Sequence, residues 1–289
     1  MRIRFTFFTV AALLATTTLP SLAFSPVDVL NFLTPSDTYT LQKDVAYGPR
    51  PRQQLDTYTP TSEPPAQGWP VVVFFYGGSW NRGERAQYRF LGEALASQGV
   101  LTVVADYRLY PEVRYPDFLD DSAAALAFSM QHAADWGGNP AKVFVMGHSA
   151  GAYNAAMLAL DARWLAKHSQ SPSQLAGWIG LAGPYDFFPI THADAKPVFY
   201  HPEYPQDSLP IDHISPTAPR ALLMAATTDD LVNPRQNTLG MARRLEEARI
   251  PVTLKMHERV SHTTLIAAMS RPLRWMAPVL SDVVKFITL

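Results

Sequence analysis

The chain contains no cysteine among its 289 residues. That absence excludes disulfide bonds, a cysteine nucleophile, thiolate metal ligands and a lipid-modified N-terminal cysteine. Charge of either sign is not in excess, because 24 Lys and Arg residues are balanced by 25 Asp and Glu residues, and no basic stripe is present. Nucleic acid is therefore not an expected partner. No repeat or low-complexity tract is present, and a 47% hydrophobic composition is ample for one large core.

Long apolar runs are also scarce, and the only one lies at the N-terminus. Arg2 and Arg4 precede the apolar segment 5–19, and Ser21-Leu22-Ala23 offers small residues to a signal peptidase. This pattern predicts a secretory signal peptide over residues 1–23. The alternative is an uncleaved anchor, although the segment is shorter than the ~20 residues that a membrane span needs. We expect no stable membrane span after cleavage, and export to a bacterial periplasm or the external medium.

Residues 24–37 are expected to form a linker or a short docking segment, and residues 38–289 one α/β domain. Strand-like and helix-like segments alternate there, which predicts a mostly parallel sheet with helices on both faces. An irregular stretch at 184–219, rich in Pro, His, Asp and aromatics, is expected to form a cap or pocket wall. The expected strands are an antiparallel edge hairpin (38–47 and 53–58), then 71–75, 100–105, 142–146, 178–182, 221–226 and 252–256. The expected helices are 87–98, 118–132, 152–160, 237–249 and 279–287.

The pentapeptide Gly147-His148-Ser149-Ala150-Gly151 follows a strand-like run and precedes a helix-like one. This is the context in which a G-x-S-x-G sequence presents a nucleophilic serine on a sharp turn. Ser149 is therefore the predicted nucleophile. The amide of Ala150, at the positive end of the helix, is a predicted donor to an oxyanion. His148 is expected to point away from the site and to pack against the sheet.

A serine hydroxyl needs a base to take its proton, and in this kind of fold an acid and then a histidine follow the serine in the chain. Asp229 and Asp230 both follow the strand expected at 221–226, at the edge where such sites form. His257 and His262 both follow the last expected strand. We favour His262 as the base, because a histidine beyond a loop can turn toward the serine.

The loop Tyr76-Gly77-Gly78-Ser79-Trp80 directly follows another apolar strand. Glycine pairs allow backbone amides to turn toward a bound oxygen, so the amides of Gly78 and Ser79 are predicted to complete the oxyanion hole with Ala150. Aromatic walls suit apolar acyl groups. The residues expected to line the substrate pocket, or alternatively to pack in the core, are Tyr76, Trp80, Asn81, Tyr185, Phe187 and Phe188.

Together these motifs resemble the α/β-hydrolase superfamily, in its esterase and lipase branch with an H-G-G-x-W oxyanion loop. That branch includes carboxylesterases, feruloyl and acetyl xylan esterases and kynurenine formamidases. The resemblance covers about residues 38–289 and includes Asp106-Tyr107-Arg108-Leu109, whose Asp and Arg are implied to bond loops near the site. An Asp-x-x-Val pattern in the branch implies Asp229 as the acid. Two departures are Tyr76, which replaces the usual histidine of the loop, and Ser261, which replaces a common glycine.

The expected function is that of an exported serine hydrolase that cleaves small-molecule carboxylic esters. Ser149, His262 and Asp229 would act as nucleophile, base and orienting acid, and no metal or organic cofactor is needed. The alternatives are an amidase of the kynurenine formamidase type and, from a different class, a non-catalytic ligand-binding protein on the same fold. The sequence does not indicate an oligomeric state.

Overall fold

The computed structural model describes residues 25–289, so the predicted signal peptide lies outside the described residues. One eight-stranded sheet dominates, with the strand order β1-β2-β4-β3-β5-β6-β7-β8. The strands from β4 to β8 along this order are parallel, and β2 pairs antiparallel with both β1 and β4. This confirms the predicted fold class. The strands are β1 (Tyr39–Ala46), β2 (Gln54–Pro60), β3 (Trp69–Phe75), β4 (Leu101–Ala105), β5 (Gly138–His148), β6 (Gly177–Leu181), β7 (Ala221–Ala226) and β8 (Val252–His257).

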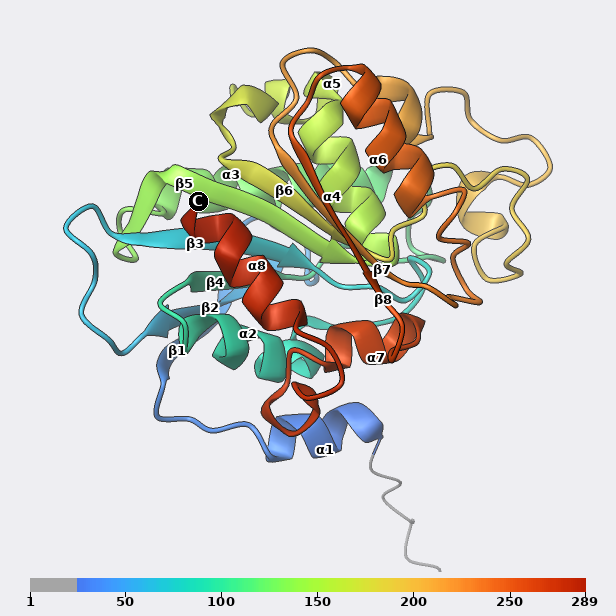
Figure 1. The fold of residues 1–289 in the computed structure, drawn as a ribbon. Coiled ribbons are helices and arrows are strands. Elements are labelled where there is room, and N and C mark those ends of the chain that lie inside the picture. Colours follow the sequence, from blue (N-terminus) through green and yellow to red (C-terminus); the bar gives the residue numbers. More distant parts are fainter. Residues whose placement is uncertain (1–24) are drawn as a thin grey trace, which may run out of the picture.

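Helices cover both faces of this sheet. Figure 1 shows α4 and α6 on one face and α2 and α8 on the other. Among the described residues, no helix is long and apolar enough to span a membrane. The helices are α1 (Pro26–Phe32), α2 (Arg89–Ala96), α3 (Asp117–His132), α4 (Ala150–Leu160), α5 (Ala162–Ala166), α6 (Thr238–Glu247), α7 (His262–Ala267) and α8 (Val279–Thr288).

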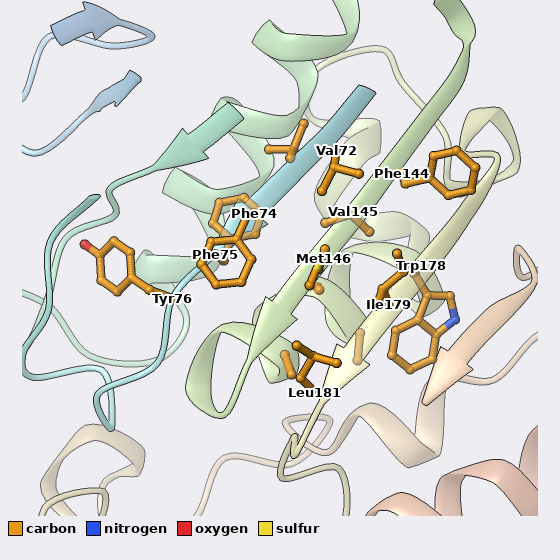
Figure 2. Close-up of a cluster of buried hydrophobic side chains, with 14 of the residues drawn as sticks. Val72, Phe74, Phe75, Tyr76, Phe144, Val145, Met146, Trp178, Ile179 and Leu181 are labelled. Carbon is orange, nitrogen blue, oxygen red and sulfur yellow. The ribbon is translucent and has the colours of Figure 1, made fainter. Parts of the chain in front are cut away.

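The central strands are apolar on both faces because both faces are covered. Every residue of β4 and β7 is buried, and residues 71–75 of β3 have no exposed surface. Figure 2 shows this layer, in which labelled side chains of β3 lie beside those of the paired strand β5 and the next strand β6. Full burial of one such large side chain is worth about 1.5–3 kcal/mol. Burial of this layer therefore stabilises the central strands of the sheet.

Some boundaries differ from those expected. Residues 24–37 include the helix α1, which is tied to the body because Asn31 donates to the Ala86 carbonyl at 3.1 Å and accepts from the Phe90 amide at 3.1 Å. The helix expected at 87–98 begins as a 3₁₀ turn, Arg85–Tyr88, before α2. Strand β5 is longer than expected at both ends and reaches His148, immediately before the predicted nucleophile.

The segment 184–219 connects β6 to β7 with no strand and only two 3₁₀ turns, Pro197–Phe199 and Pro210–His213. It is nevertheless packed, because the Phe199 ring is fully buried and lies 4.9 Å from the Trp80 ring, centroid to centroid. Trp80 belongs to the loop after β3. The segment therefore lies over the carboxyl end of the sheet, where the loops after β3, β5, β7 and β8 carry the predicted site residues.

Candidate active site

Ser149 lies in a sharp turn between β5 and α4, with φ 54° and ψ −122°. Such a conformation in a residue other than glycine costs about 1–3 kcal/mol, so the surrounding structure must impose it. Glycine on both sides makes the turn feasible. A Cβ at Gly147 would lie 2.1 Å from the Gly151 carbonyl oxygen, and one at Gly151 would lie 2.0 Å from that of Phe75. The turn is held by a 2.8 Å hydrogen bond from the Ser149 amide to the Leu181 carbonyl.

His262 is the first residue of α7, and Ser261 is the N-cap of that helix. The Ser261 hydroxyl accepts from the Thr264 amide at 3.3 Å, and the Thr264 hydroxyl accepts from the Ser261 amide at 2.7 Å. The Ser261 hydroxyl therefore provides the Thr264 amide with an acceptor that a glycine would lack. Serine in place of the usual glycine therefore fixes the start of the helix, and with it the position of the His262 backbone.

Asp229 is the acid that meets His262. His262 Nδ1 donates to Asp229 Oδ2 at 2.8 Å, while Asp229 Oδ1 accepts from the amides of Leu231 and Val232 at 3.0 and 2.9 Å. Burial by itself favours the neutral carboxyl, but the hydrogen bond and charge of His262 and the two amides outweigh it and lower the Asp229 pKa. Asp230 is exposed. The structure therefore favours Asp229 over its neighbour.

The tautomer of His262 follows from this contact. A carboxylate only accepts, so Nδ1 carries the proton and Nε2 keeps its lone pair. Both Ser149 and His262 line one cavity of about 610 Å³. Within the described residues, no hydrogen bond joins the Ser149 hydroxyl to the imidazole, and such contacts are often long in unliganded sites. His257, the alternative base, instead lies near Asp282, with Nε2 3.8 Å from Oδ2, and is not among the residues that line the cavity.

The loop after β3 lies directly against the serine. A Cβ at Gly77 would lie 2.9 Å from Ser149 Cβ, and one at Gly78 would lie 2.3 Å from the Arg82 carbonyl oxygen. Three consecutive residues of the loop have positive φ, namely Gly78 at 121°, Ser79 at 51° and Trp80 at 56°. Gly78, Ser79 and Ala150 all line the cavity. The three residues predicted to supply oxyanion donors therefore line the same cavity as Ser149.

Four of the six residues expected to line the pocket do not line the cavity, which corrects these predictions. Tyr76 and Tyr185 are fully buried, and neither lines the cavity. Asn81 does not line it either, because its side chain donates to the Asp194 carbonyl at 3.3 Å. Trp80 does line the cavity, as does Phe187, whereas Phe188 stacks on Tyr204 with ring centroids 4.3 Å apart. Aromatic composition alone does not tell a pocket wall from the core beneath it.

The segment 184–219 supplies much of the remaining wall. Its lining residues are Pro184, Phe187, Pro189, Ile190, Thr191, His192 and Ala195. At the rim, Arg82 of the loop after β3 pairs with Asp194 of this segment at 2.7 Å. Both side chains are largely exposed, so the pair adds little stability, but it balances the charge of Arg82 at the rim. This segment therefore contributes several apolar side chains to the wall, among them Phe187, Ile190 and Ala195.

His148 was expected to point away from the site, but it lines the cavity and packs against His262. Its ring centroid is 4.9 Å from that of His262, and its Nε2 donates to the His262 carbonyl oxygen at 3.0 Å. Burial, and secondarily the neighbouring His262, lowers the His148 pKa to about 3, so its imidazole stays neutral. Sequence reasoning missed this because strand alternation gives the direction of a side chain only within the regular part of β5. Its position next to the serine was the available signal.

In sequence, the chain is similar to proteins that are described as esterases. The family model BD-FAE matches residues 55–243. A probable isoprenylcysteine alpha-carbonyl methylesterase of Arabidopsis thaliana is 27% identical over 249 residues, which are 78% of this chain and 51% of that protein. Esterase LipC of Mycobacterium tuberculosis is 27% identical over 67% of this chain and 52% of its own length. The chain thus spans about half the length of these two curated relatives.

Solved structures share the fold across nearly the whole chain. A truncated carbohydrate esterase from gut microbiota has a TM-score of 0.74 at 17% identity, with 88% of this chain and 97% of that one covered. A bacterial heroin esterase has a TM-score of 0.73 at 22% identity, with 90% and 88% covered. At these identities the likeness establishes the fold and leaves substrate preference to other arguments.

Proposed function

This chain belongs to the BD-FAE family, and on that premise we propose that it is a serine hydrolase that cleaves carboxylic esters. The similar proteins named above support the reaction class, since each is described as an esterase or methylesterase. The observation that carries the proposal is the buried 2.8 Å contact between Asp229 and His262, at a cavity that Ser149 also lines. A base with its proton on Nδ1 and its lone pair on Nε2 is what a serine nucleophile requires.

In the proposed reaction, the Ser149 hydroxyl oxygen attacks the acyl carbonyl carbon while His262 Nε2 takes its proton. The carbonyl oxygen becomes negative and is bound by the amides of Gly78, Ser79 and Ala150. The C–O bond to the alcohol then breaks, and the alcohol leaves with the proton from His262. Water, deprotonated by the same Nε2, then attacks the acyl carbon. The bond from that carbon to Ser149 Oγ breaks, the carboxylic acid leaves, and His262 returns the proton to Ser149. Asp229 keeps its charge throughout and stabilises the imidazolium.

The cavity supports esters with an apolar acyl group. Trp80 is 3% exposed and meets Phe187 with ring centroids 6.2 Å apart, so the wall beside the predicted oxyanion loop is rigid and aromatic. Ile190 and Ala195 add further apolar surface. A panel of p-nitrophenyl esters of rising acyl length would define the chain length that fits.

Ser149→Ala tests the nucleophile. We expect kcat/KM for p-nitrophenyl esters to fall by about three orders of magnitude or more, because the acyl-enzyme can no longer form. Ser36→Ala, which removes an exposed hydroxyl, is the matched control and should leave activity unchanged. A Ser149→Ala variant that hydrolyses these esters at the wild-type rate would reject the proposal. N-formylkynurenine, assayed beside the esters, tests whether amides are also cleaved.

We further propose export, with cleavage of the N-terminal segment after Ala23. The support is its charge and apolar pattern. Expression in a bacterium, followed by intact-mass measurement of the periplasmic protein, checks this. A mature mass that begins at Phe24 is the expected result, and an uncleaved protein found only in the membrane fraction would contradict it.

A further inference from the structure

The loop that carries two of the proposed oxyanion donors has both of its ends gathered at one buried carboxylate. The loop leaves β3 at Tyr76, and its chain returns through Gly83 to Arg85. The Tyr76 hydroxyl donates to Asp106 Oδ1 at 2.6 Å, and the Arg85 amide donates to the same oxygen at 2.8 Å. Asp106 is 4% exposed. One oxygen atom therefore holds the first and last parts of the loop together.

Arg52, just before β2, adds a second bridge between the same two ends. Its Nη2 donates to the Tyr76 hydroxyl and to the Gly83 carbonyl, both at 2.7 Å, and its Nε donates to the Tyr107 carbonyl at 3.0 Å. The Tyr76 hydroxyl thus donates to a carboxylate and accepts from a guanidinium. It is the one side-chain group in the described structure that contacts both Asp106 and Arg52 by hydrogen bonds.

The ring of Tyr76 is also fixed. It stacks between Tyr88 and Tyr107, with centroid distances of 5.5 and 5.0 Å. A Cβ at Gly83 would lie 2.7 Å from Tyr76 Cδ2, so the returning loop passes directly over this ring. Figure 2 shows Tyr76 at the end of β3, with its hydroxyl directed away from the labelled side chains of β5 and β6. Its hydroxyl therefore faces the loop's attachment point, and Tyr76 is not among the residues that line the substrate cavity.

We propose that Tyr76 is a positioning residue, whose hydroxyl holds the Gly78 and Ser79 amides in their oxyanion-binding orientation through Asp106 and Arg52. The backbone at residues 78–80 has positive φ and does not adopt this shape without restraint. Histidine, the common residue here in the resembling esterases, has a shorter side chain than the phenol. In this chain the phenol therefore spans the distance between the strand end and the carboxylate.

Tyr76→Phe removes only the hydroxyl and keeps the stacked ring. Loss of a whole oxyanion donor typically reduces kcat about 10²- to 10³-fold, so a displaced donor should cost about 10- to 100-fold. Because Tyr76 does not line the cavity, KM should stay within about twofold of the wild-type value. Inactivation by a p-nitrophenyl phosphonate, whose phosphoryl oxygen takes the place of the oxyanion, should slow by the same factor as kcat.

Tyr39→Phe is the matched control, since that buried hydroxyl also accepts from an arginine, at 2.6 Å from Arg89 Nε, but lies on the edge strand β1. It should keep the wild-type kcat. Arg52→Lys is a second variant. It replaces the guanidinium, which donates to three acceptors, by one ammonium group, so its kcat should also fall. A wild-type kcat in Tyr76→Phe would overturn the proposal, whatever the result for Arg52→Lys. So would a rise in KM at constant kcat, which would place Tyr76 against the substrate.

The positioning role rests on the proposed function, and Ser149→Ala assayed in parallel keeps the two separate. An active Ser149→Ala variant refutes the serine mechanism itself. An inactive one, beside a fully active Tyr76→Phe, refutes only the role assigned to the Tyr76 hydroxyl.

Discussion

Replacement of Asp229 by asparagine separates two tasks that the carboxylate performs with different oxygens. Oδ1 accepts from two backbone amides, which hold the turn after β7, and Oδ2 accepts from His262 Nδ1. In Asp229→Asn the side-chain oxygen must remain with the two amides, because an NH₂ group there would face two donors. The new NH₂ group then lies against His262 and donates to Nδ1.

That donation moves the imidazole proton to Nε2, the nitrogen that should accept from Ser149. A base in this tautomer cannot take the serine proton, and the same exchange in a well-studied serine protease lowers kcat about 10⁴-fold. We expect a similar loss in kcat/KM, which corresponds to about 5.5 kcal/mol of transition-state stabilisation at 1.36 kcal/mol per tenfold. The fold should persist, because loss of a charge-assisted hydrogen bond costs only about 1.5–3 kcal/mol of stability.

The assay is hydrolysis of a p-nitrophenyl ester at fixed pH, with far-UV circular dichroism to confirm the fold. Asp230→Asn is the matched control, because that neighbouring carboxylate is exposed and should be replaceable without effect. A folded Asp229→Asn variant that retains more than about a tenth of the wild-type kcat/KM would refute the tautomer reasoning. A large loss in Asp230→Asn instead would show that the wrong aspartate had been assigned.

Two further predictions concern stability. His148 has a pKa of about 3 when folded and about 6.5 when unfolded, so the unfolded chain binds the extra proton between these values. From this group alone, the free energy of unfolding should fall by about 2 kcal/mol from pH 6.5 to pH 5. Urea titrations of His148→Gln over this pH range should show a smaller fall. An equal dependence of the free energy of unfolding on pH in the two proteins would contradict the assignment. Gly151→Ala should destabilise the protein by about 1–3 kcal/mol or prevent folding, because its Cβ would lie 2.0 Å from the Phe75 carbonyl. Gly240→Ala should instead be neutral or stabilising, because a Cβ at that position would lie 3.8 Å from its nearest contact, the Arg235 carbonyl oxygen. The denaturant midpoints of the two variants would test this difference.

Much of the fold was predictable because its signals are local. Continuous apolar runs such as Val71 to Phe75 occur where a strand is buried on both faces, and helices between such runs imply parallel pairing. The turn at Ser149 was also predictable from the sequence. Its signals are the flanking glycines, the strand before it and the helix after it, and all of these are adjacent in the chain. The chain order of acid and histidine then narrowed the candidates to Asp229 or Asp230 for the acid and to His257 or His262 for the base.

What the sequence left open depends on contacts between distant segments. Tyr76 and Tyr185 are aromatic, as residues of a pocket wall often are, yet both side chains are fully buried. The choice between Asp229 and Asp230 depends on which side chain the turn after β7 directs inward. The direction of His148 is set by its hydrogen bond to the His262 carbonyl, 114 residues along the chain. Apart from the Asp-x-x-Val pattern, which favoured Asp229, no local pattern encodes these orientations.

The central claim is that Ser149 forms a covalent bond with the acyl carbon of the substrate. Mass spectrometry of the protein treated with a fluorophosphonate probe, followed by peptide mapping, tests it most directly, because the probe reacts only with an activated serine. The account predicts one added probe mass per chain on Ser149, and none in Ser149→Ala or, over the same time, in Asp229→Asn. An unlabelled wild-type protein that still hydrolyses esters, or a label mapped to another residue, would contradict it.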